Sequence, residues 1–103
     1  MADVPERVRY ILKDYALEGD PHGIETLGRD VRQPKLAWFP DEFERLLRAG
    51  GPTPQWWGHK LYYDEWTNDQ AHLLDRDLRL IWTAVAPGKP YPLDTAGNQP
   101  ERG

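Results

Sequence analysis

The sequence predicts a small all-α domain, and three of its features support this fold class. Apolar residues recur at steps of three and four over residues 5–17, 20–31, 40–49 and 68–85, which is the spacing of one helix face. The segments between them are rich in proline and glycine, which end helices. The chain of 103 residues has the length of one domain. We therefore expect four short helices; the alternative is an α+β fold with a small sheet from residues 35–39 and 59–66.

The globular domain is expected to cover residues 1–93, followed by a flexible C-terminal tail at residues 94–103. Beyond Pro87 the sequence has three more prolines, three glycines and few apolar residues. Such a composition buries too little apolar surface to offset the entropy of ordering the chain. Tyr91 and Leu93 are the positions expected to pack back on the domain.

The first expected helix covers residues 5–17. Asp3 is a suitable capping residue, and Pro5 suits the first turn because the amide hydrogen that proline lacks has no partner there. Residues 19–21 (GDP) then end the helix. Its apolar stripe consists of Val8, Ile11, Leu12 and Tyr15.

Two further helices are expected before residue 52. Asp20 can cap a helix that has Pro21 at its first position, and Pro40 begins another that ends at residues 50–51 (GG). Gly23 and Gly28 weaken the prediction of the earlier one, since each costs about 1 kcal/mol in a helix relative to alanine. The apolar positions of these two helices are Ile24, Leu27 and Val31, and Phe43, Leu46 and Leu47.

The last helix, residues 68–85, has the clearest signal. Thr67 and Gln70 form a capping-box pattern, in which each side chain bonds to the backbone amide of the other residue. Pro87 and Gly88 follow its end, where a helix cannot continue. Its apolar stripe consists of Ala71, Leu74, Leu78, Ile81 and Val85.

A dense aromatic stretch, residues 56–66 (WWGHKLYYDEW), precedes the last helix. Large rings at this density either fill the core of a chain that is short of aliphatic bulk or form a recognition surface. Trp and Tyr suit both places because each has a large apolar area and one polar group. The sequence alone leaves both interpretations open.

Negative charge is concentrated in one segment. The formal net charge is −4, and residues 64–77 hold five acids but only one basic residue, Arg76. This segment would repel a phosphate backbone, which argues against nucleic acid as a partner. It would attract a basic protein. The alternative is that these acids only solvate the surface and match the dipole at a helix N-terminus.

Several classes of function are disfavoured by what the chain lacks. It has no cysteine and no serine, which excludes disulfides, thiolate zinc sites and the commonest nucleophiles. We also find no phosphate-binding glycine loop and no paired metal motif around His59 or His72. No apolar run approaches the roughly 20 residues of a membrane span, and no signal peptide is evident. We therefore expect a cytoplasmic non-enzyme with no cofactor, no metal and no membrane partner.

Three segments resemble the immunity proteins of bacterial contact-dependent growth inhibition systems. They are residues 43–47 (FERLL), 62–66 (YYDEW) and 77–82 (DLRLIW), so the likeness spans residues 43–82. Members of that family are small, helical and often acidic, and they bind a toxin domain to block its active site. The resemblance implies the same kind of activity here, but it carries over no functional residue position by position.

We expect a non-catalytic inhibitor of the immunity or antitoxin class, which presents an acidic and aromatic surface to a basic protein. That partner would be a toxin domain or another product of the same gene cluster. One alternative is a small-molecule or metal-binding protein that uses residues 56–72. Another is an accessory subunit or small regulator of a bacterial or phage gene cluster. The predicted partner-binding residues are Trp56, Trp57, Tyr62, Tyr63, Asp64, Glu65, Trp66, Asp69, Asp75 and Asp77.

Overall fold

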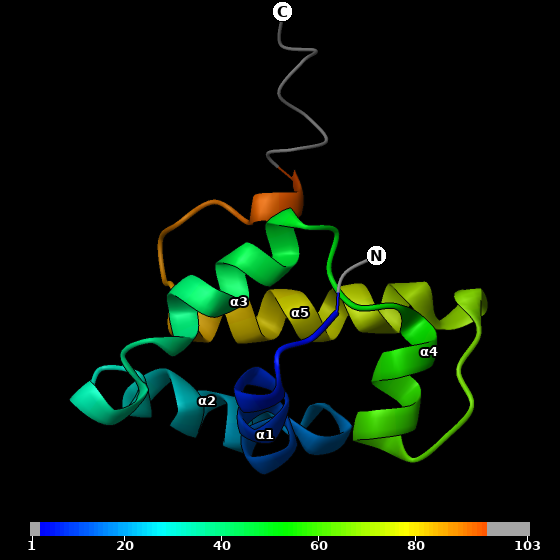
Figure 1. Ribbon diagram of the computed structural model, residues 1–103, viewed down its shortest axis with the longest axis horizontal. Helices are drawn as coiled ribbons and strands as arrows, with labels where there is room; N and C mark the ends of the chain where they lie inside the picture. The colour runs from blue at the N-terminus through cyan, green and yellow to red at the C-terminus, as the bar shows by residue number, and fades with distance from the viewer. Residues whose placement is uncertain (1–2, 95–103) are drawn as a thin grey trace, which may run out of the picture.

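The computed structural model describes residues 3–94 and shows an all-α domain, as the sequence predicts. Its longest element is α5 (Ala71–Val85), which runs across the molecule with the other helices packed around it (Figure 1). Residues 3–94 contain no strand, so the α+β alternative is wrong. Residues 35–39 lie in turns and the start of a helix, and residues 59–66 begin in a π-helical turn and continue as a loop.

The first helix, α1 (Glu6–Tyr15), is shorter than predicted and begins after Pro5, with no side-chain cap from Asp3. A 3₁₀ turn, η1 (Leu17–Gly19), leads into α2 (Pro21–Asp30). Asp20 caps α2 as predicted, because its carboxylate accepts a hydrogen bond from the backbone amide of His22 at 3.1 Å.

The helix α2 packs directly on α5, and Gly28 makes this close approach possible. A Cβ atom at this position would lie 2.7 Å from the backbone oxygen of Ala84 on α5, closer than atoms pack. The glycine that weakens the helix signal in the sequence is therefore explained by helix–helix packing. Ile24, Leu27 and Val31 are buried on the same helix, as predicted.

The middle of the chain consists of a 3₁₀ turn, η2 (Pro34–Leu36), and α3 (Phe39–Arg48). Phe39 and Phe43 are fully buried and stack on each other with ring centroids 5.4 Å apart. Gly50 and Gly51 end α3 with φ angles of 109° and 76°, which only glycine adopts readily.

The short helix α4 (Pro54–Trp57) is continuous with a π-helical turn, η3 (Gly58–Tyr62). Thr53 caps α4 by accepting a hydrogen bond from the amide of Trp56 at 3.0 Å. A loop then leads to η4 (Asn68–Gln70), which begins with the predicted capping box at Thr67 and continues into α5.

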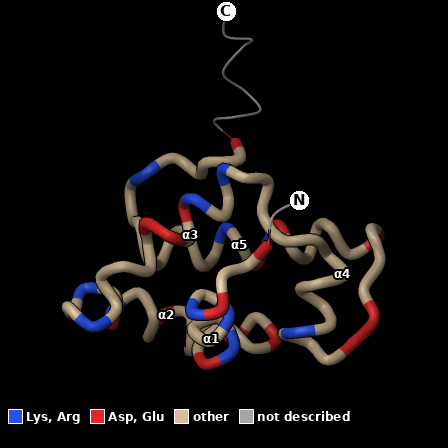
Figure 2. Tube along the Cα trace, in the orientation of Figure 1, with Lys and Arg blue, Asp and Glu red and all other residues tan. Residues whose placement is uncertain are grey.

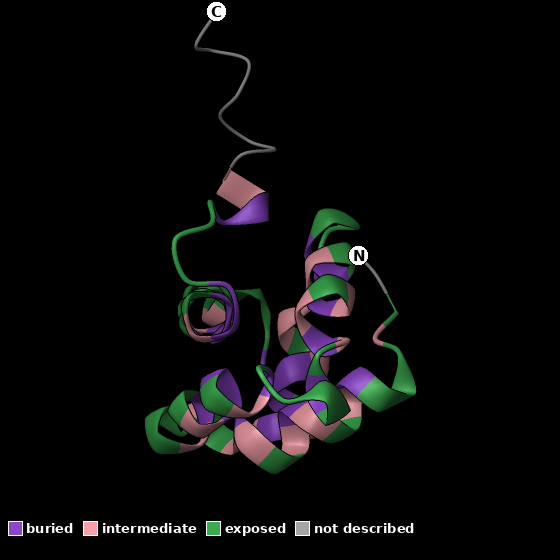
Figure 3. Cartoon of the chain, turned by 90° about the vertical axis from the view of Figure 1, so that its left-hand side faces the viewer, coloured by how far each residue is buried: buried purple, intermediate pink, exposed green. Residues whose placement is uncertain are grey.

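The core is one apolar cluster in which every helix takes part (Figure 3). It includes the predicted stripe of α5, except that Ala71 is exposed. None of the helices within residues 3–94 is both long enough and apolar enough to cross a membrane.

After α5 the chain turns back along the domain, with Tyr91 buried and Leu93 half-buried, as predicted. The carboxylate of Asp94, expected in the flexible tail, instead bonds to both terminal nitrogens of Arg79, at 2.7 and 2.6 Å. These bonds lower the pKa of Asp94 and raise that of Arg79. Asp94 is therefore held against α5, and residues 95–103 of the predicted tail lie outside the described residues.

Candidate functional site

The aromatic stretch is divided between core and surface. Trp57 is fully buried and Trp66 is 6% exposed, whereas Trp56 and Tyr62 are half-buried. Tyr63 is 67% exposed. Trp57 and Trp66 were predicted to contact a partner, and their burial corrects that prediction because the core of the domain needs their area.

Trp66 closes the loop after η3 by packing back onto it. A Cβ atom at position 58 would lie 2.3 Å from Cγ of Trp66, so only glycine leaves room for the indole ring. The ring of Tyr62 also packs against this indole, with centroids 4.4 Å apart. A side-chain hydrogen bond of 3.2 Å from Gln55 to Asn68 also ties the far end of the loop to α4.

Asp77 also differs from its predicted role, because it is completely buried. One of its carboxylate oxygens accepts hydrogen bonds from the indole N–H of Trp57 at 3.0 Å and from the hydroxyl of Tyr62 at 2.6 Å. The other oxygen accepts two bonds from the guanidinium of Arg76, at 3.1 and 3.2 Å. A buried carboxylate requires such partners, and here they join α5 to α4 and η3. Asp77 therefore positions other residues and cannot contact a partner.

The turn η1 packs closely against Tyr62 and Asp77 at Gly19, which has a φ angle of 67°. A Cβ atom at Gly19 would lie 2.6 Å from the Tyr62 hydroxyl and 2.9 Å from a carboxylate oxygen of Asp77. Burial, and then the hydrogen bond to Asp77, raises the pKa of Tyr62 to about 12. The phenol thus stays protonated and acts as a donor to Asp77 at neutral pH.

Four exposed residues follow this network along the loop between η3 and α5, and we call them the acidic edge. They are Tyr63, Asp64, Glu65 and Asp69. None of their three carboxylates forms an ion pair with any residue of the described chain, 3–94. In Figure 2 the acidic positions of this loop lie on the right of the molecule.

Tyr63 has an unusual backbone conformation for an exposed aromatic residue. Its φ and ψ angles are 54° and 43°, in the left-handed region where glycine and asparagine are common. This conformation ends η3 and turns the ring outward. The ammonium of Lys13 on α1 lies 5.8 Å from the ring centroid, which is a cation–π distance.

Asp75 does not belong to the acidic edge. Its carboxylate accepts a hydrogen bond from Arg79 at 2.7 Å, one turn further along α5. The same arginine also binds Asp94, so Asp75 and Asp94 share one guanidinium within the domain. A partner contact at Asp75 would have to compete with this ion pair.

Within residues 3–94, no group of three histidine, cysteine or carboxylate side chains could hold an ion. His59 and His72, named in the small-molecule alternative, are both exposed.

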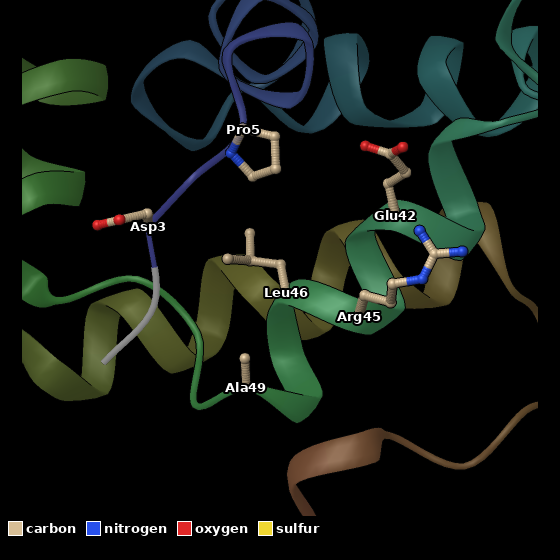
Figure 4. A pocket seen from close by; sticks show the side chains of 6 residues that line it. All are labelled: Asp3, Pro5, Glu42, Arg45, Leu46 and Ala49. Carbon is tan, nitrogen blue, oxygen red and sulfur yellow. The ribbon is translucent and has the colours of Figure 1, made fainter.

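A pocket of about 340 Å³ lies between the N-terminal segment and α3 (Figure 4). Leu46 and Ala49 face Pro5 across it, whereas the carboxylate of Asp3 points away. Glu42, at its rim, is already bonded to Arg7. Of the charged residues in the lining, only Arg45 is then free to orient a ligand, so we do not consider this pocket a functional site.

Comparison of the chain with protein-family models, with curated proteins and with solved structures gives no match. The function proposed below therefore rests on the residues of this chain.

Sequence reasoning missed the residues of α1 and η1 that join this site. Lys13 lies beside Tyr63, and η1, which contains Gly19 and the exposed Glu18, packs on η3. The sequence indicates only that residues 18–21 (EGDP) form a turn. Nothing in that turn indicates that it meets residues more than forty positions further on.

Proposed function

We propose that this protein is a non-catalytic, immunity-like inhibitor that binds a basic protein through the acidic edge. The observation that carries the proposal is Tyr63. A large aromatic side chain is 67% exposed, held in a left-handed backbone conformation and followed by two carboxylates without ion-pair partners in residues 3–94.

The backbone conformation of Tyr63 costs stability, and a functional role of the exposed ring accounts for it better than a role in folding. A non-glycine residue in the left-handed region costs about 1–2 kcal/mol, and the exposed ring regains little of this by burial. Strained residues concentrate at functional sites, where the surrounding structure holds them. Tyrosine is also common among the residues that dominate protein interfaces.

The charges suit a basic partner. Asp64, Glu65 and Asp69 can form charge-assisted hydrogen bonds with lysine and arginine, which are stronger than neutral ones. Before contact, their combined field would raise the rate of encounter with a positively charged surface. The acidic edge thus provides both long-range attraction and short-range contacts.

The buried residues behind the edge hold it in one shape. Trp66 anchors the loop against Gly58, and Asp77 fixes Tyr62, the residue before Tyr63. A surface that is already ordered loses less conformational entropy on binding. This explains why buried Trp57, Trp66 and Asp77 matter to the proposed site although they touch no partner.

The test is co-expression with the protein encoded by the neighbouring gene, with co-purification and growth as the two readouts. We expect the wild-type chain to co-purify and to relieve any growth inhibition by that protein. Tyr63→Gly and the triple reversal Asp64→Lys, Glu65→Lys, Asp69→Lys should lose both effects. The matched control is the triple reversal of Asp3, Glu25 and Asp41, exposed acids elsewhere on the molecule.

The outcomes are separable. Co-purification that survives the triple reversal at the acidic edge would show that another surface binds the partner. Binding without an effect on growth would favour the accessory-subunit alternative over the inhibitor.

A further inference from the structure

A second hollow lies away from the acidic edge, where α1 and α2 meet the turn η2. It is a groove of about 620 Å³, within the range of about 300–1,000 Å³ typical of small-molecule sites. Its lining from α1 and α2 is Ile11, Asp14, Tyr15 and Asp30, and η2 with its preceding residue contributes Gln33, Pro34, Lys35 and Leu36.

The electrostatics of the groove favour a cation. Asp14 is exposed and forms no ion pair with any other residue in the described part of the chain. Asp30 accepts a hydrogen bond of 2.8 Å from Tyr15 through one oxygen, which leaves the other oxygen free of side-chain donors. The helices α1 and α2 also end here, at Tyr15 and Asp30, and helix C-termini carry partial negative charge.

Tyr15 is bonded to one of these carboxylates, that of Asp30. The pKa of Tyr15 is raised, first by its hydrogen bond to Asp30, then by burial, and then by the charges of Asp30 and Asp14. Lys35 is the one basic residue in the lining, and its side chain is exposed. The two carboxylates thus outnumber the single ammonium group.

The rest of the lining is apolar. Leu36 is 8% exposed, and Ile11 and Tyr15 are half-buried, so they offer a hydrophobic wall beside the carboxylates. An aromatic ring can also attract a cation to its face. A ligand that matches both parts carries a positive group on an apolar body.

We propose that this groove binds a small organic cation, a primary ammonium or guanidinium group on an apolar body. The cation lies between the carboxylates of Asp14 and Asp30, and the apolar body lies against Ile11 and Leu36. Tyr15 holds the Asp30 carboxylate in place. The site is independent of the acidic edge and of the partner proposed for it.

The test is a titration of the ¹⁵N-labelled protein with benzylamine at neutral pH, followed by backbone amide shifts. Benzyl alcohol and benzoate, which have the same ring with a neutral or negative group, are the controls. We expect saturable shifts at residues 11–15, 30–33, 35 and 36 with benzylamine and none with benzoate. A second titration with N-acetylarginine amide shows whether a peptide side chain can supply the cation; saturation of the groove by either cation supports the site.

Asp14→Asn is the decisive variant, because this side chain makes no hydrogen bond or ion pair that the fold needs in residues 3–94. It should weaken binding of benzylamine about fivefold, the effect of losing a partly exposed charge pair. Glu25→Gln, an exposed acid of α2 outside this groove, should leave the affinity unchanged. The proposal is overturned if neither cation saturates the groove, if benzyl alcohol binds as well as benzylamine, or if Asp14→Asn has no effect.

Discussion

Replacing Asp77 with alanine should destabilise the domain more than any other change to a charged residue. The substitution removes the acceptor for Trp57 and Tyr62 and leaves the indole N–H buried without a partner. Hydrogen bonds to a charged group are worth about 1.5–3 kcal/mol each. The bonds from Trp57 and Tyr62 together, with the indole N–H left unsatisfied in the core, give an expected loss of about 3–5 kcal/mol. That is a large fraction of the roughly 5–15 kcal/mol by which domains are stable.

The assay is urea denaturation followed by tryptophan fluorescence, to which Trp57 and the other four tryptophans all contribute. Asp75→Ala is the matched control, because Asp75 lies two residues away on α5 but is exposed in its pair with Arg79. That control should cost no more than about 1 kcal/mol. A loss below about 1 kcal/mol in Asp77→Ala would refute the reasoning, since the buried carboxylate would then not be what joins α5 to η3.

Three further predictions concern the same region. The pKa of Tyr62 is about 12, against 10.0 ordinarily, so the fold favours the neutral phenol. Its contribution to the free energy of unfolding should be complete below pH 10 and disappear between pH 10 and 12, a loss that Tyr62→Phe should lack in parallel denaturation curves. Gly58→Ala should cost about 1–3 kcal/mol in thermal unfolding, because the added methyl group overlaps Trp66; an unchanged Tm would show that the indole can move. Tyr63→Gly should leave stability unchanged or raise it by up to about 1 kcal/mol; a clear loss in the same assay would mean that the exposed ring stabilises the fold.

The helices could be predicted from the sequence because their signals are local. The capping box at Thr67 and the cap at Asp20 each depend on residues within three positions, and both are present in the structure. The stripe of α5 follows from helical periodicity alone. Helix ends have weaker local signals, and α1 stops two residues before the end of its predicted range, 5–17.

Which side chains around the aromatic stretch are buried could not be predicted, because their burial depends on contacts between distant segments. Asp77 looks like one more surface acid in the sequence, and only the positions of Trp57 and Tyr62 show that it is buried. Gly19 lies more than forty residues from the side chains that require it. The exposed carboxylates of the acidic edge were predicted from composition, but their separation from Asp75 depends on the ion pair with Arg79.

The measurement that tests the acidic edge most directly is the rate of association with the neighbouring-gene product as salt is raised. For the wild-type chain we expect a rate that falls steeply with ionic strength, because salt screens the three carboxylates. The triple reversal of Asp64, Glu65 and Asp69 should slow association at low salt by about 10-fold or more, and reversal of Asp3, Glu25 and Asp41 should change it much less. Equal rates and equal salt dependence in all three proteins would contradict the account.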